Sequence, residues 1–210
     1  MPGGTVGVTR YAFSFEAATL YSGAHAVANL RKREVHVEYR QGLVIVNTGS
    51  GKGKSTAAFG TALRALGNGF SVLVVQFIKG KWKTGEQAAA GRFEKFEFRP
   101  MGEGFTWDTK DRERDTQVAM AAWSFGRERI LSGETDLVVL DEINYAIDYG
   151  YVPLDDVLAA LRSRPPHVHV ILTGRNAKPE LIELADLVTE MREIKHPYKK
   201  GIKAQRGIEW

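Results

Sequence analysis

The sequence predicts an α/β fold in which a mainly parallel sheet is covered by helices on both faces. Two observations lead to this prediction. Short apolar runs alternate with helix-like stretches along most of the chain, and most of these runs lack the polar alternation of half-exposed strands. Such runs are typical of strands buried on both sides, and a helical crossover between two strands makes them parallel.

Local patterns define the elements in chain order. "LVIVN" and "SVLVVQFI" are apolar runs of strand length, "FEKFEFR" alternates as a strand does, and "GNG" is a stop signal after the first helix. The expected order is strand 43–47, helix 54–66, strand 71–78, strand 93–99, helix 111–131, strand 135–142, helix 153–161, strand 167–174, helix 179–185 and strand 187–191.

The length of 210 residues favours one domain with one substantial core. We assign that domain to residues 41–210 and treat residues 1–40 as an N-terminal extension. Within the extension, helical spacing predicts a helix from Ser14 to about Lys32, and alternation predicts a short strand from Val35 to Tyr39.

Composition excludes several classes of chemistry. The chain has no cysteine, which rules out disulfides, thiolate metal sites and a cysteine nucleophile, and fits a reducing cytoplasm. No apolar run approaches the roughly 20 residues that span a bilayer. The net charge of +4 suits a phosphorylated small ligand and a nucleic acid equally well. A cytoplasmic protein is expected.

The stretch "NTGSGKGKST" carries the clearest chemistry. Gly49, Gly51 and Gly53 permit a tight turn with inward-pointing N–H groups, Lys54 can reach terminal phosphates, and Ser55 or the residue after it can offer a hydroxyl to Mg²⁺. A glycine- and lysine-rich surface turn is the alternative. The nucleotide-binding residues predicted from this loop are Thr48, Gly49, Ser50, Gly51, Lys52, Gly53, Lys54, Ser55 and Thr56. The loop refines the fold prediction to a P-loop NTPase-like (RecA-like) architecture.

The loop departs from the usual pattern by one residue. G-x-x-x-x-G-K-[ST] ending at Ser55 requires its first glycine at position 48, which is Thr48. Counting from Gly49 leaves the loop one residue short. A shortened loop should displace the phosphate chain, so the geometry of ordinary kinases and ATPases does not follow.

Two acids, Asp141 and Glu142, end the apolar run "LVVL". From that position an acid can bind or orient Mg²⁺ beside the loop, so Ser55, Asp141 and Glu142 are the candidate metal ligands. Capping of a following helix that contains Asn144 is the alternative role.

Seven strings in order resemble the P-loop type of ATP:corrinoid adenosyltransferase, from about residue 42 to the C-terminus. They are "GLVIVNTGSGKGKSTAAFG", "VVQFIKG", "MGEGFTW", "VVLDEIN", "ILTGRNA", "ADLVTEM" and "GIKAQRGIE". The resemblance implies transfer of the 5′-deoxyadenosyl group of ATP to a Co(I) corrinoid with release of triphosphate. The short loop of this family holds ATP in reversed orientation, so that the ribose C5′ is open to attack.

The resemblance also implies roles for particular residues. Lys54 and Lys52, with Mg²⁺ held by Ser55 and Glu142, would neutralise the triphosphate, and Glu86 and Arg175 match positions that touch the nucleotide. Phe105 and Trp107 match aromatic residues that displace the lower axial ligand of the Co(II) corrinoid, so that a flavin or flavodoxin can reduce it.

Further expectations from the family are less specific to single residues. Members are homodimers, and a charged leader covers the partner's active site. The more apolar residues 1–40 do not match that leader, which leaves this extension a candidate lid only. Core packing is the alternative for Phe105 and Trp107. Contacts to the nucleotide or the corrinoid are one interpretation of four residues after a strand, and a solvated loop is the other: Lys79, Lys81, Trp82 and Lys83. His167 and His169 are interpreted as ordinary strand histidines.

Two other classes of function compete with this reading. A P-loop kinase or NTPase acting on a small molecule would need a catalytic base and should release ADP. A RecA-like motor should show salt-dependent nucleic-acid binding, but the sequence has no basic stripe with interleaved aromatics.

Replacement of Trp107 by alanine tests the role implied for the aromatic loop. Trp107→Ala should slow the reaction that starts from Co(II) with a flavin reductant much more than the reaction that starts from preformed Co(I). Adenosylation rates measured under both conditions decide the matter. Equal loss in the two assays would contradict a ligand-displacing role.

Overall fold

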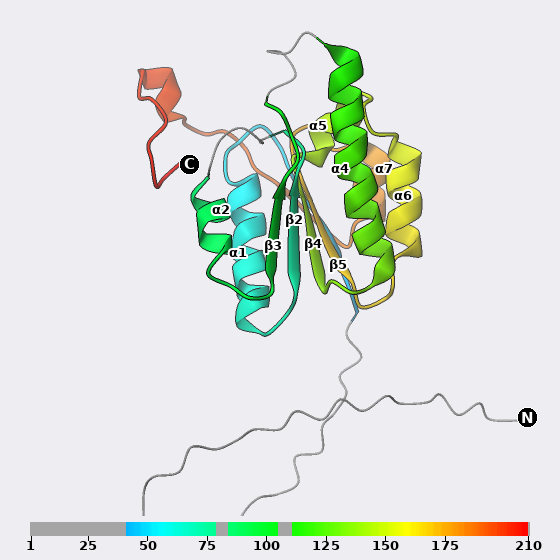
Figure 1. The fold of residues 1–210 in the computed structure, drawn as a ribbon. Coiled ribbons are helices and arrows are strands. Elements are labelled where there is room, and N and C mark those ends of the chain that lie inside the picture. The colour runs from blue at the N-terminus through cyan, green and yellow to red at the C-terminus, as the bar shows by residue number, and fades with distance from the viewer. Residues whose placement is uncertain (1–40, 79–83, 105–110, 210) are drawn as a thin grey trace, which may run out of the picture. The chain divides into compact units, whose positions relative to one another are not determined.

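Six parallel strands form one sheet in the computed structural model, which describes residues 41–78, 84–104 and 111–209 (Figure 1). The strands are β1 (Val44–Thr48), β2 (Val72–Gln76), β3 (Phe96–Pro100), β4 (Leu137–Asp141), β5 (His169–Thr173) and β6 (Leu187–Glu190). They lie in the order β3-β2-β4-β5-β1-β6, and every neighbouring pair is parallel. The prediction of a mainly parallel sheet is confirmed.

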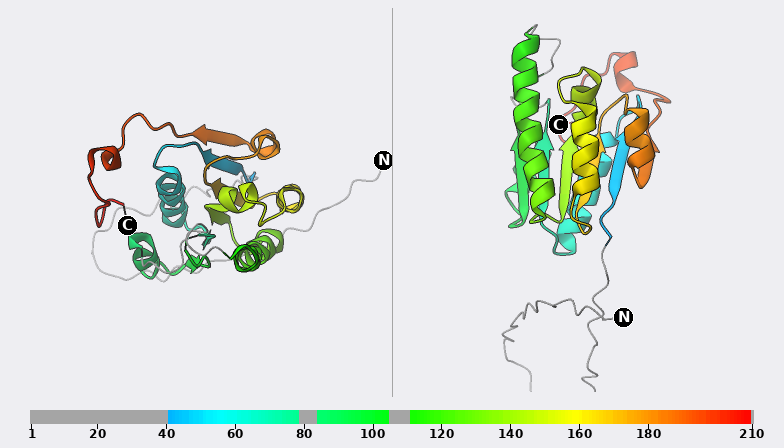
Figure 2. Two further views of the ribbon diagram at one scale, coloured as in Figure 1. Left: turned by 90° about the horizontal axis from the view of Figure 1, so that it is seen from above. Right: turned by 90° about the vertical axis from the view of Figure 1, so that its right-hand side faces the viewer.

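Helices cover both faces of this sheet, as the two views of Figure 2 show. The helices are α1 (Lys54–Gly67), α2 (Gly85–Ala90), α4 (Arg112–Ser132), α5 (Ile143–Asp148), α6 (Leu154–Ser163), α7 (Pro179–Leu184) and the 3₁₀ helix η1 (Pro197–Lys200). Helices α1 and α2 lie on one face, and α4, α6 and α7 lie on the other. The sequence patterns predicted α1, α4, α6 and α7. Helix α5 was named only in the alternative role of the two acids, and α2 and η1 were not predicted.

The strands are buried because successive side chains enter two different cores. In β2, Leu73 and Val75 belong to the larger core under α4 and α6, whereas Val72 and Val74 face α1. All four side chains are at most 1% exposed. The continuous apolar runs of the sequence therefore reflect a sheet with no solvent-facing side at its centre.

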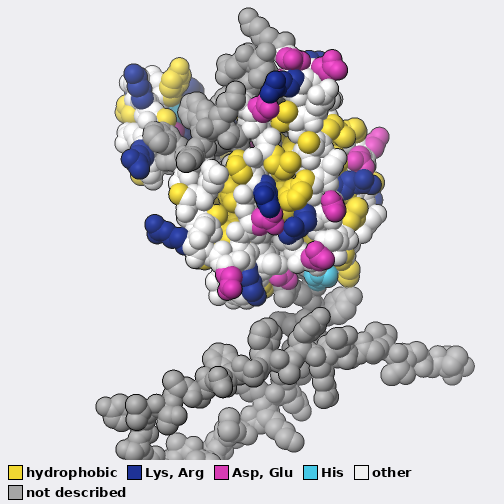
Figure 3. Space-filling view, viewed as in Figure 1, with side chains coloured by type: hydrophobic (Ala, Val, Ile, Leu, Met, Phe, Trp, Pro, Cys, Tyr) yellow, Lys and Arg dark blue, Asp and Glu magenta, His cyan; other side chains and the backbone are white. Residues whose placement is uncertain are grey.

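Charged side chains protect the edge strand β3. The guanidinium groups of Arg99 and Arg129 each lie 5.9 Å from the ring centre of Phe125, and both pair with Glu97. On the face shown in Figure 3, hydrophobic side chains are accordingly interrupted by basic and acidic ones. Charges at an edge oppose pairing with a further strand.

Some sequence predictions fall outside the described residues. The helix from Ser14 to about Lys32 and the strand from Val35 to Tyr39 both lie in residues 1–40, and so does the candidate lid. Within the described ranges, no helix is long and apolar enough to cross a membrane.

Truncation of Leu140 should destabilise the fold strongly. Leu140 is fully buried at the centre of the sheet, and Gly126 of α4 approaches it so closely that an added Cβ would lie 2.9 Å from Leu140 Cδ2. Leu140→Ala should therefore lower the free energy of unfolding by about 2–5 kcal/mol.

Leu63 on α1 provides the matched control, since it is 56% exposed. Leu63→Ala should change the free energy of unfolding by less than about 0.5 kcal/mol. Denaturant titrations of both variants make the comparison. Similar losses in the two would contradict the burial described here.

Candidate functional site

The glycine-rich loop connects the end of β1 to the start of α1. Strand β1 ends at Thr48 and α1 begins at Lys54, which leaves five residues between them. Gly49 and Gly53 have φ angles of 96° and 106°, a region that favours glycine, and Gly53 caps the helix. The free N–H groups of the first helical turn thus open onto the loop, as in anion sites at helix N-termini.

The segment after β6 forms the back wall of the loop. The Met191 N–H donates to Thr48 O at 2.8 Å, and the Gly51 N–H donates to Met191 O at 2.6 Å. A Cβ at Gly49 would lie 2.5 Å from Met191 O, and one at Gly51 would lie 2.7 Å from the carbonyl carbon of Arg192. These two glycines are required by close backbone packing as well as by turn geometry. Sequence reasoning did not find this wall.

Lys54 bends back into the loop that precedes it. Its Nζ donates to Gly49 O at 2.9 Å and to Gly51 O at 2.6 Å. Burial, followed by the charge of Arg175, lowers the pKa of Lys54, and the carboxylate of Glu142 opposes that shift. The cation therefore stands in a partly desolvated position that an anionic ligand would stabilise.

Thr48 explains the missing first glycine of the loop. It is still part of β1, where it pairs with Glu190 of β6, and its hydroxyl accepts a hydrogen bond of 3.2 Å from Ala177 N. The turn therefore begins one residue later than in the usual motif. Thr48 also ties the loop to the β5–α7 connection.

The other predicted loop residues differ in exposure. Ser50, Lys52 and Thr56 are exposed, and Ser55 is half-buried in the first turn of α1. Lys52 forms an ion pair with Glu209 near the C-terminus. All of these residues border the loop, and the hydroxyl nearest to the interior is that of Ser55.

The two acids at the end of β4 have different surroundings. Asp141 is fully buried, and its carboxylate accepts from Gln76 Nε2 at 2.9 Å and from Thr173 Oγ1 at 2.8 Å. Glu142 is half-buried at the N-cap of α5, where its side chain makes no capping hydrogen bond. The alternative role of helix capping is thus not fulfilled by this side chain.

Arg175 and Glu86 lie on different connections. Arg175 is exposed in the turn after β5, and its charge influences the pKa values of both Lys54 and Tyr145. Glu86 lies in the first turn of α2, which Thr84 caps through a hydrogen bond to Gln87 N. The structure thus brings Arg175 to the loop and sets Glu86 on the helix that follows residues 79–83.

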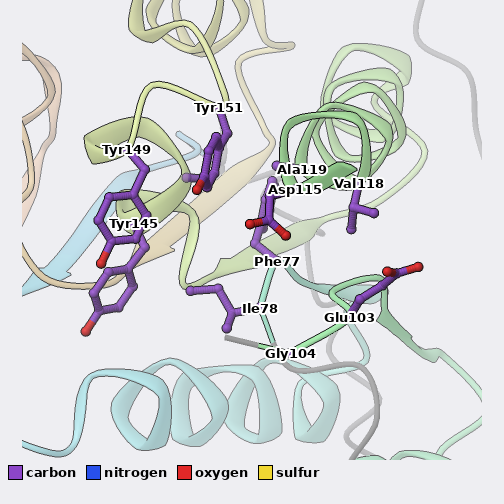
Figure 4. A pocket seen from close by; sticks show the side chains of 11 residues that line it. Phe77, Ile78, Glu103, Gly104, Asp115, Val118, Ala119, Tyr145, Tyr149 and Tyr151 are labelled. Carbon is purple, nitrogen blue, oxygen red and sulfur yellow. The ribbon is translucent and has the colours of Figure 1, made fainter. Parts of the chain in front are cut away.

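A pocket lined with tyrosines lies at the same end of the sheet (Figure 4). Tyr145, Tyr149 and Tyr151 form a row, with ring centres 6.2 Å and 5.8 Å apart. Ile78 and Gly104 line the opposite side, and Asp115 of α4 also reaches the pocket. Burial raises the pKa of Tyr145, so this residue presents a neutral hydroxyl.

Several predicted site residues fall outside the described residues. Phe105 and Trp107 are among them, as are Lys79, Lys81 and the residues 82–83. The segment that leads to Phe105 is described, and Gly104 N donates to Ile78 O at 2.9 Å. Gly104, the last described residue before Phe105, therefore lies at the wall of the tyrosine-lined pocket.

The two histidines have ordinary structural roles, but only His169 lies in β5, and His167 lies in the turn before it. His167 Nε2 lies 3.0 Å from Gly133 O, and His169 Nδ1 accepts from Leu43 N at 3.1 Å. Across the residues that the structure describes, no group of three or more histidines, cysteines or acids could hold a metal ion.

Together these features define the class of protein. A glycine loop joins β1 to a helix, a lysine bends into that loop, and two acids lie at the end of β4, which is separated from β1 by β5; this is a P-loop nucleotide-binding α/β protein. More narrowly, residues 40–210 match the model of the family described as ATP:corrinoid adenosyltransferase BtuR/CobO/CobP, and the chain belongs to that family.

Individual relatives agree with this assignment. A corrinoid adenosyltransferase of Pseudomonas aeruginosa is 52% identical over 171 residues, which cover 81% of this chain and 84% of the relative. The corrinoid adenosyltransferase CobA of Salmonella typhimurium is 47% identical over 178 residues, 85% of this chain and 90% of the relative. Among solved structures, the flagellar accessory protein FlaH from Methanocaldococcus jannaschii covers 72% of this chain at 17% identity and a TM-score of 0.48, too remote for any argument.

Asp148 anchors the connection that carries Arg175, and its removal should cost stability in a pH-dependent way. Asp148 accepts from Lys178 Nζ at 2.6 Å and from Asn176 Nδ2 at 2.8 Å, and these bonds hold its pKa below the usual 3.8. A lowered carboxyl pKa stabilises the fold above 3.8, and that contribution is lost as the pH falls through the folded-state pKa.

Asp148→Asn should therefore lower the free energy of unfolding by about 0.5–1 kcal/mol at neutral pH, and the difference from wild type should vanish in strong acid. Denaturant titrations at several pH values provide the measurement. Glu180→Gln, on an exposed acid of α7, should show no such dependence. A loss that persists unchanged at low pH would argue against the ionic contact.

Proposed function

We propose that this protein transfers the 5′-deoxyadenosyl group of ATP to the Co(I) centre of a corrinoid and releases triphosphate, in the synthesis or salvage of adenosylcobalamin. Membership of the family supports the reaction. The observation that carries the proposal is the position of a shortened phosphate loop and a tyrosine-lined pocket at one end of the sheet. Tyr145 links them, since it lines the pocket and its N–H donates to the backbone oxygen of Glu142, the acid assigned to the loop, at 3.2 Å.

The reaction needs no basic side chain. Co(I) donates an electron pair to C5′, a cobalt–carbon bond forms, and the bond from C5′ to the triphosphate oxygen breaks with its electron pair on the leaving group. The protein must hold the two substrates in line and stabilise the charge on triphosphate. Lys54, Lys52 and the N-terminus of α1 are placed around the loop for the second task.

We infer that the nucleotide lies reversed in the loop, with C5′ and not the γ-phosphorus facing the pocket. The back wall at Met191 and Arg192 closes one side of the loop, and Thr48 starts the turn one residue late. Both features reduce the length of loop backbone that can bind the phosphates. A displaced phosphate chain is what the adenosyl transfer requires.

Mg²⁺ would be held by Ser55 and Glu142. The fit rests on the donors present: a half-buried hydroxyl in the first turn of α1 and a carboxylate whose charge acts on Lys54. Mg²⁺ is usually bound by one or two protein oxygens together with phosphates and water, so a larger cluster is not needed. When bound, the ion would neutralise charge on the departing triphosphate.

The corrinoid and its reductant complete the proposal. The tyrosine hydroxyls and Asp115 can hydrogen-bond to amide groups at the corrin periphery, and Phe105 and Trp107 would exclude the lower axial ligand. A flavin or flavodoxin-type protein would supply the electron. A homodimer, a cytoplasmic location, a nucleotide contact by Glu86 and a lid formed by residues 1–40 belong to the same proposal.

The products of the reaction test this function. Incubation with ATP, Mg²⁺ and chemically reduced cobalamin should give triphosphate and a light-sensitive alkylcobalamin, followed by the visible spectrum and by phosphate analysis. ADP or orthophosphate as the main product would instead indicate a kinase or an NTPase.

Lys54→Met should lower the rate of this transfer by about 100-fold or more, because a cation at the leaving group is lost. Lys95→Met is the control, since Lys95 is an exposed lysine that bonds to Gly69 O. It should keep the wild-type rate. Full activity of Lys54→Met would contradict the role assigned to Lys54 at the leaving group.

A further inference from the structure

Glu142 has a backbone conformation that glutamate rarely adopts. Its φ and ψ are 68° and 18°, the left-handed region. Among the described non-glycine residues, Asn176 alone shares a positive φ, and asparagine tolerates that region better. Strained residues persist where surrounding contacts fix them, and they cluster at functional sites.

A hydrogen-bond relay holds Glu142 in this conformation. The Glu142 N–H donates to Thr173 Oγ1 at 2.8 Å, and the Thr173 hydroxyl donates to Asp141 Oδ1 at 2.8 Å. Gln76 Nε2 donates to the other carboxylate oxygen of Asp141 at 2.9 Å. Asp141, Thr173 and Gln76 are at most 2% exposed.

The direction of this relay follows from the chemistry of its members. A backbone N–H can only donate, and a hydroxyl has one proton to donate. Thr173 Oγ1 therefore accepts from the Glu142 N–H with a lone pair and donates its own hydrogen bond to Asp141 Oδ1. The chain of donors and acceptors has a single consistent arrangement.

The sheet supplies the three members from three adjacent central strands. Gln76 ends β2, Asp141 ends β4 and Thr173 ends β5, and the register pairs Gln76 with Asp141 and Leu140 with Leu172. The register of the strands thus brings the three residues together at the carboxyl ends of β2, β4 and β5.

The relay also separates the roles of the two acids. Both carboxyl oxygens of Asp141 accept hydrogen bonds from buried side chains and are shielded from solvent, so Asp141 has a structural role inside the protein. Glu142 is half-buried and begins α5 at the same end of the sheet as the loop. Of the pair, Glu142 is the acid placed to meet a ligand at the loop.

We propose that Thr173 is a positioning residue. Because its hydroxyl bonds to both Asp141 and the Glu142 N–H, it fixes the backbone of Glu142 and so directs the Glu142 carboxylate toward the metal–triphosphate site. This inference rests on the proposed function. It assigns the Asp141 carboxylate to the relay and leaves metal binding to Glu142 and Ser55. Thr173 itself touches no substrate.

Thr173→Val, which removes the hydroxyl and keeps the shape, tests the inference. The affinity for ATP should be measured by calorimetry over a series of Mg²⁺ concentrations, without corrinoid. In wild type, Mg²⁺ should strengthen ATP binding. In Thr173→Val, the Mg²⁺ concentration required should rise about tenfold, the usual effect of losing a group that orients a metal ligand. Thr173→Ser, which keeps the hydroxyl, should stay within about twofold of wild type.

A double-mutant comparison isolates the path through Glu142. In a Glu142→Gln background, Thr173→Val should have no further effect on the Mg²⁺ dependence, because the two residues act as one unit. An additive effect would overturn the proposal. So would a lower melting temperature with wild-type Mg²⁺ dependence, since that result indicates a structural role only.

A second variant keeps the test decisive if Thr173→Val does not fold. Gln76→Met removes the donor at the other end of the relay, and it should raise the required Mg²⁺ concentration several-fold; no change would overturn the proposal. Because these readouts use ATP and Mg²⁺ alone, absence of adenosyl transfer in the wild type would count against the proposed function and not against Thr173.

Discussion

The carboxyl ends of β2, β4 and β5 depend on one buried carboxyl group. Asp141 is fully shielded from solvent, and a buried polar group is costly unless hydrogen bonds replace its hydration. Gln76 and Thr173 supply two such bonds, each worth about 0.5–1.5 kcal/mol. A left-handed glutamate costs about 1–3 kcal/mol. The two hydrogen bonds together are of the same size as the cost of the Glu142 conformation.

A second constraint shapes the phosphate loop from behind. The turn is short because β1 continues through Thr48, which is held by β6 on one side and by Ala177 on the other. The chain after β6 then packs against Gly49 and Gly51. The length of the loop is therefore set by the edge strand β6, which pairs with β1. The glycine missing from the usual motif is the result of this pairing.

The sequence predicts most of the fold because the strands are buried on both sides and the helices have clear boundaries. Helix α2 was missed because six residues rich in alanine and glycine carry no periodicity, and η1 because proline opens only one short turn. Lys54, Ser55 and the glycines were found from local spacing. The back wall at Met191 was not, since it depends on a contact between segments about 140 residues apart in the chain.

The sequence does not predict that Asp141 and Glu142 have different roles. Two adjacent acids after an apolar run are equivalent in a motif, but Asp141 is the last residue of β4 and Glu142 is the left-handed N-cap of α5, so they enter different surroundings. Asp141 is held inside by Gln76 and Thr173, residues that are distant in sequence and for which the sequence predicted no role. For a reaction in which the metal of the substrate is the nucleophile, fixed geometry is the protein's main contribution. A network of hydrogen bonds between buried side chains on three adjacent strands suits that task.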